Sequence, residues 1–158
     1  SNHSQNRVGP QMPASTAHDD WGIEVQQMLV DVFADRDLPN SLEFICPDEH
    51  LESVSFLTAD NTNVGFVHGH RAGQQTGLER WWAGQALGDQ PTALSQILFV
   101  GHFHNWNLNS VGNQRYIITT PSLDNGSSWF TVARGNVATA GVLTLRVRDG
   151  VPTDRLIV

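Results

Sequence analysis

Two histidine pairs are the residues of this sequence best suited to chemistry. One pair reads His68-Gly69-His70, and the other reads His102-Phe103-His104. Neutral imidazole is the commonest protein ligand for zinc-like metal ions. Side chains at positions i and i+2 of an extended segment point to opposite faces, but Gly101 can turn the backbone and direct both imidazoles of the second pair towards one site. The pairs therefore predict a metal site. The alternative is that they are ordinary loop histidines.

Each pair directly follows a short apolar run. The first run is Val64–Val67 and the second is Ile97–Val100. Continuous runs of branched and aromatic residues are typical of strands buried on both faces. In open α/β sheets, ligands collect outside the carboxyl ends of such strands. We therefore expect two core strands that present all four histidines at one edge of a sheet.

The remaining patterns predict the elements that would hold these strands in place. Apolar residues at helical spacing predict a core-packing helix over Trp21–Ala34 and a second helix over Thr76–Leu87. Turn residues between alternating stretches predict hairpins. The paired stretches are Ser53–Ala59 with Val64–Val67, Trp106–Val111 with Arg115–Thr119, and Val142–Val147 with Arg155–Val158. A short strand is expected over Leu42–Cys46, and loops are expected over Arg7–Ala17 and Pro121–Ser128. The fold class predicted is α/β, sheet-rich in the second half.

Composition restricts the classes of function. The chain has 158 residues, a net charge of −7 and no lysine among its nine basic residues. This acidic balance argues against a protein that coats nucleic acid, although it does not exclude a nuclease. The single cysteine, Cys46, fits a reducing cytoplasm and is interpreted as apolar filler. No apolar run approaches the roughly 20 residues of a membrane span, so no membrane partner is expected.

Three short motifs carry a resemblance to a known family. Ser1-Asn2-His3, His68-Gly69-His70 and Gly101-His102-Phe103-His104 resemble the last three metal-binding motifs of the calcineurin-like metallophosphoesterase superfamily, in the same order. The text around Arg7, Arg80-Trp81-Trp82 and Pro121–Trp129 also resembles phosphoesterases encoded by bacteriophages. The resemblance implies a layered α/β sandwich. It also implies that residues 1–158 are a single domain, the carboxyl-terminal portion of a metallophosphoesterase domain whose start, with its Asp-x-His and Gly-Asp motifs, is missing.

The resemblance also implies roles for individual residues. Asn2, His68 and His102 would bind one of two divalent ions, and His104 would bind the other. The ions implied are manganese, or zinc and iron. His3 would be the catalytic acid for the leaving alkoxide, or a donor that stabilises charge on the phosphoryl oxygens. Arg7, His70 and Arg71 would bind substrate, with His70 open to a supporting role behind the metal ligands instead.

Three functional hypotheses follow. The first is metal-dependent hydrolysis of phosphate esters at a dinuclear centre by a metal-activated hydroxide, with DNA or a nucleotide among the candidate substrates. The second is a non-catalytic protein-binding scaffold of the same fold. The third is an unrelated single-metal hydrolase built from the four clustered histidines. Intact Asn2, His68, His102 and His104 favour the first.

Overall fold

The computed structural model describes residues 7–9, 12–13, 21–34, 36, 43–45, 47, 52–124, 131–132, 135 and 140–158. The chain forms two compact units, Ser1–Glu52 and Ser53–Val158. Each is described by itself. Whether the whole chain is one domain, as the resemblance implies, stays a prediction.

The described residues of the first unit include a helix and a small hairpin. Strands β1 (Arg7–Gly9) and β2 (Met12–Pro13) pair antiparallel, so the segment predicted as a loop contains a short hairpin. Helix α1 spans Trp21–Ala34, as the periodicity predicts, but it contains no buried residue. The expected core packing of its apolar stripe is therefore not seen. Residues 43–45 lie in no strand, which corrects the strand predicted there.

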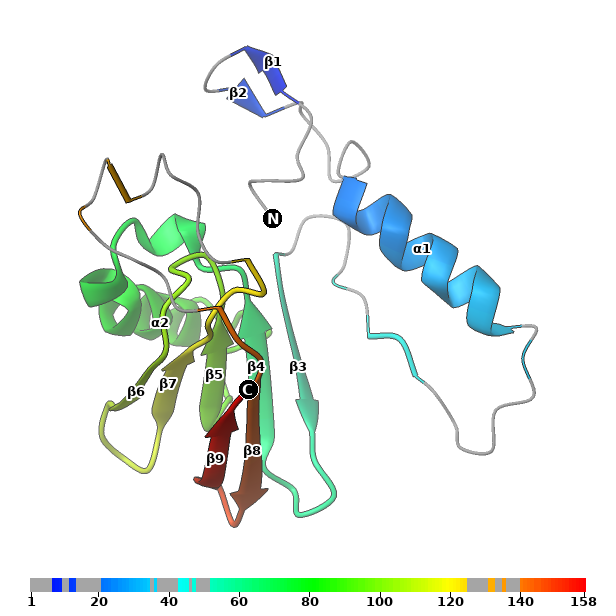
Figure 1. The fold of residues 1–158 in the computed structure, drawn as a ribbon. Helices are drawn as coiled ribbons and strands as arrows, with labels where there is room; N and C mark the ends of the chain where they lie inside the picture. Colours follow the sequence, from blue (N-terminus) through cyan, green and yellow to red (C-terminus); the bar gives the residue numbers. More distant parts are fainter. Residues whose placement is uncertain are drawn as a thin grey trace. The chain divides into compact units, whose positions relative to one another are not determined.

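The second unit is built on a five-stranded mixed sheet in the order β3-β4-β5-β7-β6 (Figure 1). Its strands are β3 (Ser53–Leu57), β4 (Asn63–Val67), β5 (Ile97–Val100), β6 (Asn107–Ser110) and β7 (Tyr116–Thr119). Strand β5 is central and pairs parallel with both β4 and β7, whereas β3 and β6 are antiparallel to their neighbours. Both predicted core strands and both predicted hairpins in this region are confirmed, and so is the α/β class.

One face of this sheet, the helix face, is covered by α2. The helix spans Leu78–Leu87, two residues later than predicted, because Gln75–Gly77 forms a 3-10 turn, η3, before it. Leu78 and Trp82 pack against side chains of β5 and β7. The Trp82 indole Nε1 donates a hydrogen bond to the Thr92 carbonyl at 2.8 Å, so this buried ring has a polar partner.

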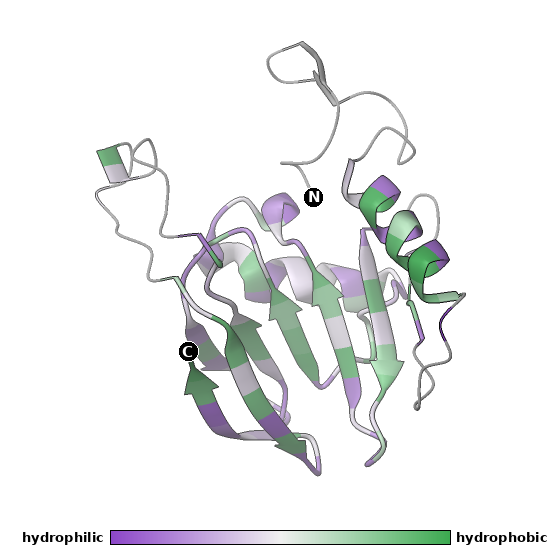
Figure 2. Cartoon of the chain, turned by 45° about the vertical axis from the view of Figure 1, so that its right-hand side comes forward, coloured by the Kyte–Doolittle hydropathy of each residue, from purple (hydrophilic) through white to green (hydrophobic). Residues whose placement is uncertain are grey.

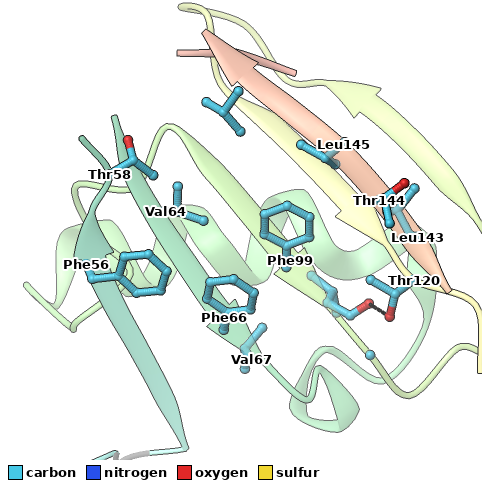
Figure 3. Close-up of a pocket in the computed structure, with 13 residues that line it drawn as sticks. Phe56, Thr58, Val64, Phe66, Val67, Phe99, Thr120, Leu143, Thr144 and Leu145 are labelled. Carbon is cyan, nitrogen blue, oxygen red and sulfur yellow. Dashed lines mark hydrogen bonds between the residues drawn. The ribbon is translucent and has the colours of Figure 1, made fainter. Parts of the chain in front are cut away.

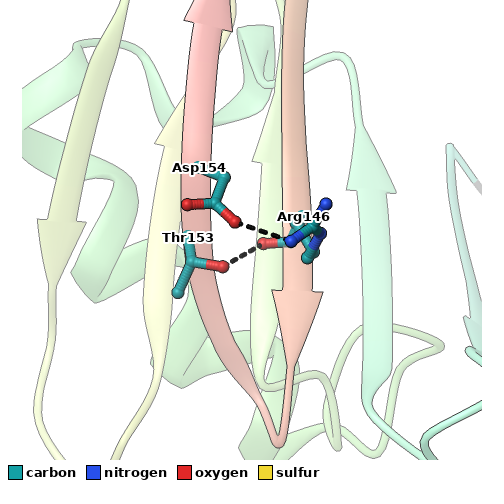
Figure 4. Close-up of polar contacts among 3 residues, drawn as sticks. All are labelled: Arg146, Thr153 and Asp154. Carbon is teal, nitrogen blue, oxygen red and sulfur yellow. Dashed lines mark hydrogen bonds and ion pairs between the residues drawn. The ribbon is translucent and has the colours of Figure 1, made fainter.

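The opposite face, the hairpin face, lies against strands β8 (Leu143–Arg148) and β9 (Val151–Ile157). Apolar and polar residues alternate along this hairpin (Figure 2), as expected for strands with one covered face. The pairing shifts by one residue after Thr144, and Asp154 there has a left-handed φ of 46°. This bulge brings Asp154 within 3.0 Å of Arg146 (Figure 4).

A turn-to-turn contact attaches the hairpin to the sheet. Asp149 and Gly150 both have positive φ, as a two-residue hairpin turn requires. The Asp149 amide donates to the Asp60 carboxylate at 2.8 Å, and the Gly150 amide donates to the Thr62 hydroxyl at 3.0 Å. Hydrogen bonds from the Thr58 hydroxyl, foremost, and then from the Asp149 amide and from Thr62 lower the pKa of Asp60 to about 2.

An apolar cavity of about 580 Å³ lies between the hairpin and the sheet (Figure 3). Phe56, Phe66 and Phe99 form a ladder of stacked rings along its floor, with centroids 5.6 and 4.9 Å apart. The residues of β8 that line it are Leu143, Thr144, Leu145 and Val147. We call this space the hairpin cavity.

Candidate metal site

Two loops meet at the carboxyl edge of the parallel strands. In the register of β4 and β5, Val67 lies opposite Val100, so both strands end at the same level. The Gly101 amide donates to the Val67 carbonyl at 3.2 Å and extends this pairing by one residue. The residues that follow, His68 on one strand and His102 on the other, therefore leave the sheet side by side.

The structure brings the imidazoles of these two residues together. His68 Nε2 lies 3.2 Å from His102 Nδ1, and the two ring centroids are 5.0 Å apart at an interplanar angle of 72°. The ring of His70 lies 5.5 Å from that of His68 and 6.2 Å from that of His102, centroid to centroid. All three residues are partly buried. Three of the four predicted histidines thus lie together at this edge of the sheet, and the metal site itself stays a prediction.

The spacing of the two nitrogens fits a pair of ligands on one ion. Nitrogen ligands about 2.0 to 2.1 Å from zinc, at a tetrahedral angle, lie about 3.3 to 3.4 Å apart. The same spacing also fits an N–H···N hydrogen bond between two neutral imidazoles. Among the residues that the structure describes, no group of three or more histidine, cysteine or acidic side chains could hold a metal. That His68 and His102 are ligands of one ion stays a prediction.

The backbone of the second loop is strained at both histidines. His102 has a φ of 64° and His104 a φ of 55°, and left-handed conformations cost non-glycine residues about 1 kcal/mol or more each. The predicted turn led by Gly101 is present, but the positive φ values fall on the histidines and not on the glycine. A hydrogen bond of 2.7 Å from the Phe103 amide to the Gly101 carbonyl holds the turn closed.

Gly69 is the residue of the first loop that must be glycine. Its φ is 96°, and a Cβ there would lie 2.3 Å from Val100 Cγ1 and 3.4 Å from Phe103 Cε2. The first loop thus passes directly over the end of β5 and over the second loop. The backbone at Gly69 therefore packs closely against the side chains of Val100 and Phe103.

The other predicted site residues lie in different parts of the chain. His104 is partly buried at the end of the second loop, and Arg71 is exposed in η2, the 3-10 turn His70–Ala72. Arg7 begins β1 in the first unit. Asn2 and His3 lie outside the described residues, so the proposed third ligand and the proposed acid stay predictions.

The structure adds three residues that sequence reasoning missed. Gln75 Nε2 donates to Thr119 Oγ1 at 3.2 Å, Thr119 Oγ1 donates to Asn105 Oδ1 at 3.3 Å, and Asn105 Nδ2 donates to Gln75 Oε1 at 3.1 Å. The side chains form a closed ring, which we call the amide triad. The only sequence signal was the position of Asn105 directly after the second histidine pair.

The chain is similar to solved structures but matches no known sequence family. No protein-family model matches the chain, and no curated protein matches it. A structure of Vps29 from Entamoeba histolytica complexed with Zn²⁺ is similar to 67% of this chain at 20% identity and a TM-score of 0.46. Vps29 from Cryptosporidium parvum is similar to 68% at 17% identity and a TM-score of 0.41. The chain spans 60% and 55% of the length of these two structures. None of the helices described here has the length and apolar character of a membrane span.

Proposed function

We propose that this chain is part of a metal-dependent phosphoesterase and that His68 and His102 bind one of its ions. The observation that supports the proposal best is the 3.2 Å separation of their ring nitrogens at the end of two parallel strands. Asn2 is the proposed third ligand of that ion, and His104 is the proposed ligand of a second one. Divalent ions held there would polarise a phosphate ester and stabilise its developing charge.

The remaining residues of the proposal act on the substrate. His3 would protonate the leaving alkoxide, which requires an imidazolium in the reacting state. Arg71 is exposed at the rim of the first loop, where its guanidinium can form a bidentate contact with phosphate. Arg7 and His70 are proposed as further substrate contacts. A phosphate ester of DNA or of a nucleotide, and a cytoplasmic location, belong to the same proposal.

Metal binding is the first test, because it needs no knowledge of the substrate. Calorimetric titration of the chain with zinc or manganese should show most of the binding lost in His102→Ala and little change in His104→Ala. The reason is that His102 shares an ion with His68, whereas His104 is assigned to another ion. Equal losses in the two variants would contradict this division of the ligands.

The pH dependence of binding supplies a second check. Each imidazole must be neutral to coordinate, so metal ions compete with protons for the same nitrogens. Affinity should therefore rise as pH increases from about 5 to about 8, across the usual range of histidine titration. An affinity that is the same at both ends of this range would exclude histidine coordination.

Hydrolysis is tested separately. The complete protein should hydrolyse bis-p-nitrophenyl phosphate in the presence of manganese, and exhaustive chelation should abolish the activity. Turnover that survives chelation would refute metal dependence. His102→Ala is the control for contaminating phosphatases, since it should lose the activity while the fold of the chain is retained.

A non-catalytic binding scaffold is the second candidate function. The hairpin cavity favours it, because its floor presents Phe56 and Phe66 at 36% and 38% exposure. Partly exposed aromatic side chains are the usual anchors of protein interfaces. Metal binding without turnover of any phosphate ester would favour this candidate over the first.

A further inference from the structure

We infer that the amide triad of Gln75, Asn105 and Thr119 is the positioning device of the metal site. This inference rests on the proposed function, since it concerns the two loops that carry His68 and His102. Its basis is that the triad's members come from three places: the segment after the first loop, the segment after the second loop, and the end of a core strand.

Thr119 is the fixed point of the triad. It is the last residue of β7 and only 1% exposed, and it lies opposite Val100 in the parallel pairing of β7 with β5. Its hydroxyl accepts from Gln75 and donates to Asn105. Both contacts therefore start from a core strand whose position the sheet already determines.

Gln75 connects this point to the first histidine loop. Between His68 and Gln75 the chain is shaped by local hydrogen bonds, from the Ala72 amide to the Gly69 carbonyl at 3.1 Å and from the Gly73 amide to the His70 carbonyl at 3.2 Å. These closely spaced turns make the segment short and stiff. Restraining Gln75 therefore restrains the ring of His68.

Asn105 connects the same point to the second loop. It lies three residues after His102, in the segment where two left-handed residues store strain. A strained loop keeps its conformation only where its surroundings determine it. The hydrogen bond from Asn105 Nδ2 to Gln75 Oε1, at 3.1 Å, then joins the two loops directly.

The groups of the amide triad should restrain the two loops equally at every pH at which the protein is folded. Two amides and a hydroxyl do not titrate between pH 4 and 10, in contrast to the imidazoles that they position. Each member donates one hydrogen bond and accepts one within the ring. Removal of any one group breaks two of the three bonds, so single substitutions at different members should have similar effects.

The test uses the full chain and zinc ions alone. Thr119→Val removes the hydroxyl and keeps the shape of the side chain, whereas Thr119→Ser keeps the hydroxyl. Thr119→Val and Asn105→Ala should each weaken zinc binding about tenfold, the lower end of the effect of groups that orient metal ligands. Thr119→Ser and the matched control Gln74→Ala, an exposed glutamine next to Gln75, should stay within about twofold of the wild type.

Two further readouts separate positioning from simple destabilisation. The loss in Thr119→Val should be the same factor at pH 6 and pH 8. In the metal-free chain, the nuclear Overhauser contacts between the rings of His68 and His102 should weaken in Thr119→Val and persist in Thr119→Ser. A Thr119→Val variant that is less stable but keeps both its zinc affinity and its ring contacts would overturn the inference.

The two proposals fail in different ways. If the wild type binds zinc, His102→Ala does not, and Thr119→Val binds as tightly as the wild type, the metal site stands and the positioning role is wrong. If the wild type binds no zinc, the proposed function fails, and the ring contacts alone decide the positioning role.

Discussion

Replacing Gly69 by alanine tests how closely the first histidine loop lies over the sheet. The new Cβ would lie 2.3 Å from Val100 Cγ1, a distance that side-chain motion alone cannot relieve because Val100 is fully buried. Overpacking of this kind costs about 1 to 3 kcal/mol. The φ of 96° adds about 1 to 2 kcal/mol for a residue with a Cβ. We expect Gly69→Ala to lower the free energy of unfolding by about 2 to 5 kcal/mol.

Gly73→Ala is the matched control for this variant. Gly73 has a φ of 73°, and a Cβ there would meet nothing within 4 Å. It should therefore cost only the strain of about 1 to 2 kcal/mol. Urea denaturation followed by circular dichroism should separate the two variants by about 1 M in midpoint, given a slope of about 2 kcal/mol per molar. Equal midpoints would show that the loop moves away from Val100 without cost.

Three smaller effects are expected elsewhere. Asp60→Asn should remove a component of stability that is present above pH 4 and is lost as the pH falls towards about 2, because folding lowers the pKa of Asp60. Unfolding of the wild type and the variant, measured from pH 2 to 6, checks this. Trp82→Phe should cost about 1 to 3 kcal/mol in urea denaturation, because the buried Thr92 carbonyl loses its donor. Arg146→Ala should change the free energy of unfolding by less than about 0.5 kcal/mol, since both side chains of its ion pair with Asp154 are more than 60% exposed. A shift in thermal midpoint that corresponds to a larger change would show that this ion pair stabilises the fold.

Local patterns predicted the core of the second unit well. The run Ile97–Val100 is apolar because its strand is covered on both faces, and this signal needs no tertiary information. The run Val64–Val67 predicted its strand equally well, although Phe66 is 38% exposed on the hairpin face. The Asp149-Gly150 turn was predictable for a similar reason, since both residues tolerate positive φ. The convergence of His68 and His102 followed from the rule that parallel strands end at one edge.

Other features depend on contacts that a linear pattern does not contain. The amide triad joins residues 44 and 14 positions apart, and amides and hydroxyls are common on any surface. Propensity predicted a turn led by Gly101, but the left-handed conformations of that loop lie at His102 and His104. Helix α1 has the apolar stripe of a core helix and yet contains no buried residue. Periodicity predicts that a segment is helical, but it does not show which element packs against the apolar face.

The position of β5 in the sheet has a kinetic consequence. Its neighbours each belong to a local hairpin, β3 with β4 and β6 with β7, and such hairpins form within microseconds. Strand β5 pairs only with β4 and β7 among the described strands, and its pairing with β4 closes a long crossover through α2. Contacts of high sequence separation form late in folding. The two histidine loops should therefore meet only when the central strand is inserted, so that the rate at which the rings of His68 and His102 come into contact during refolding reports the last step of sheet assembly.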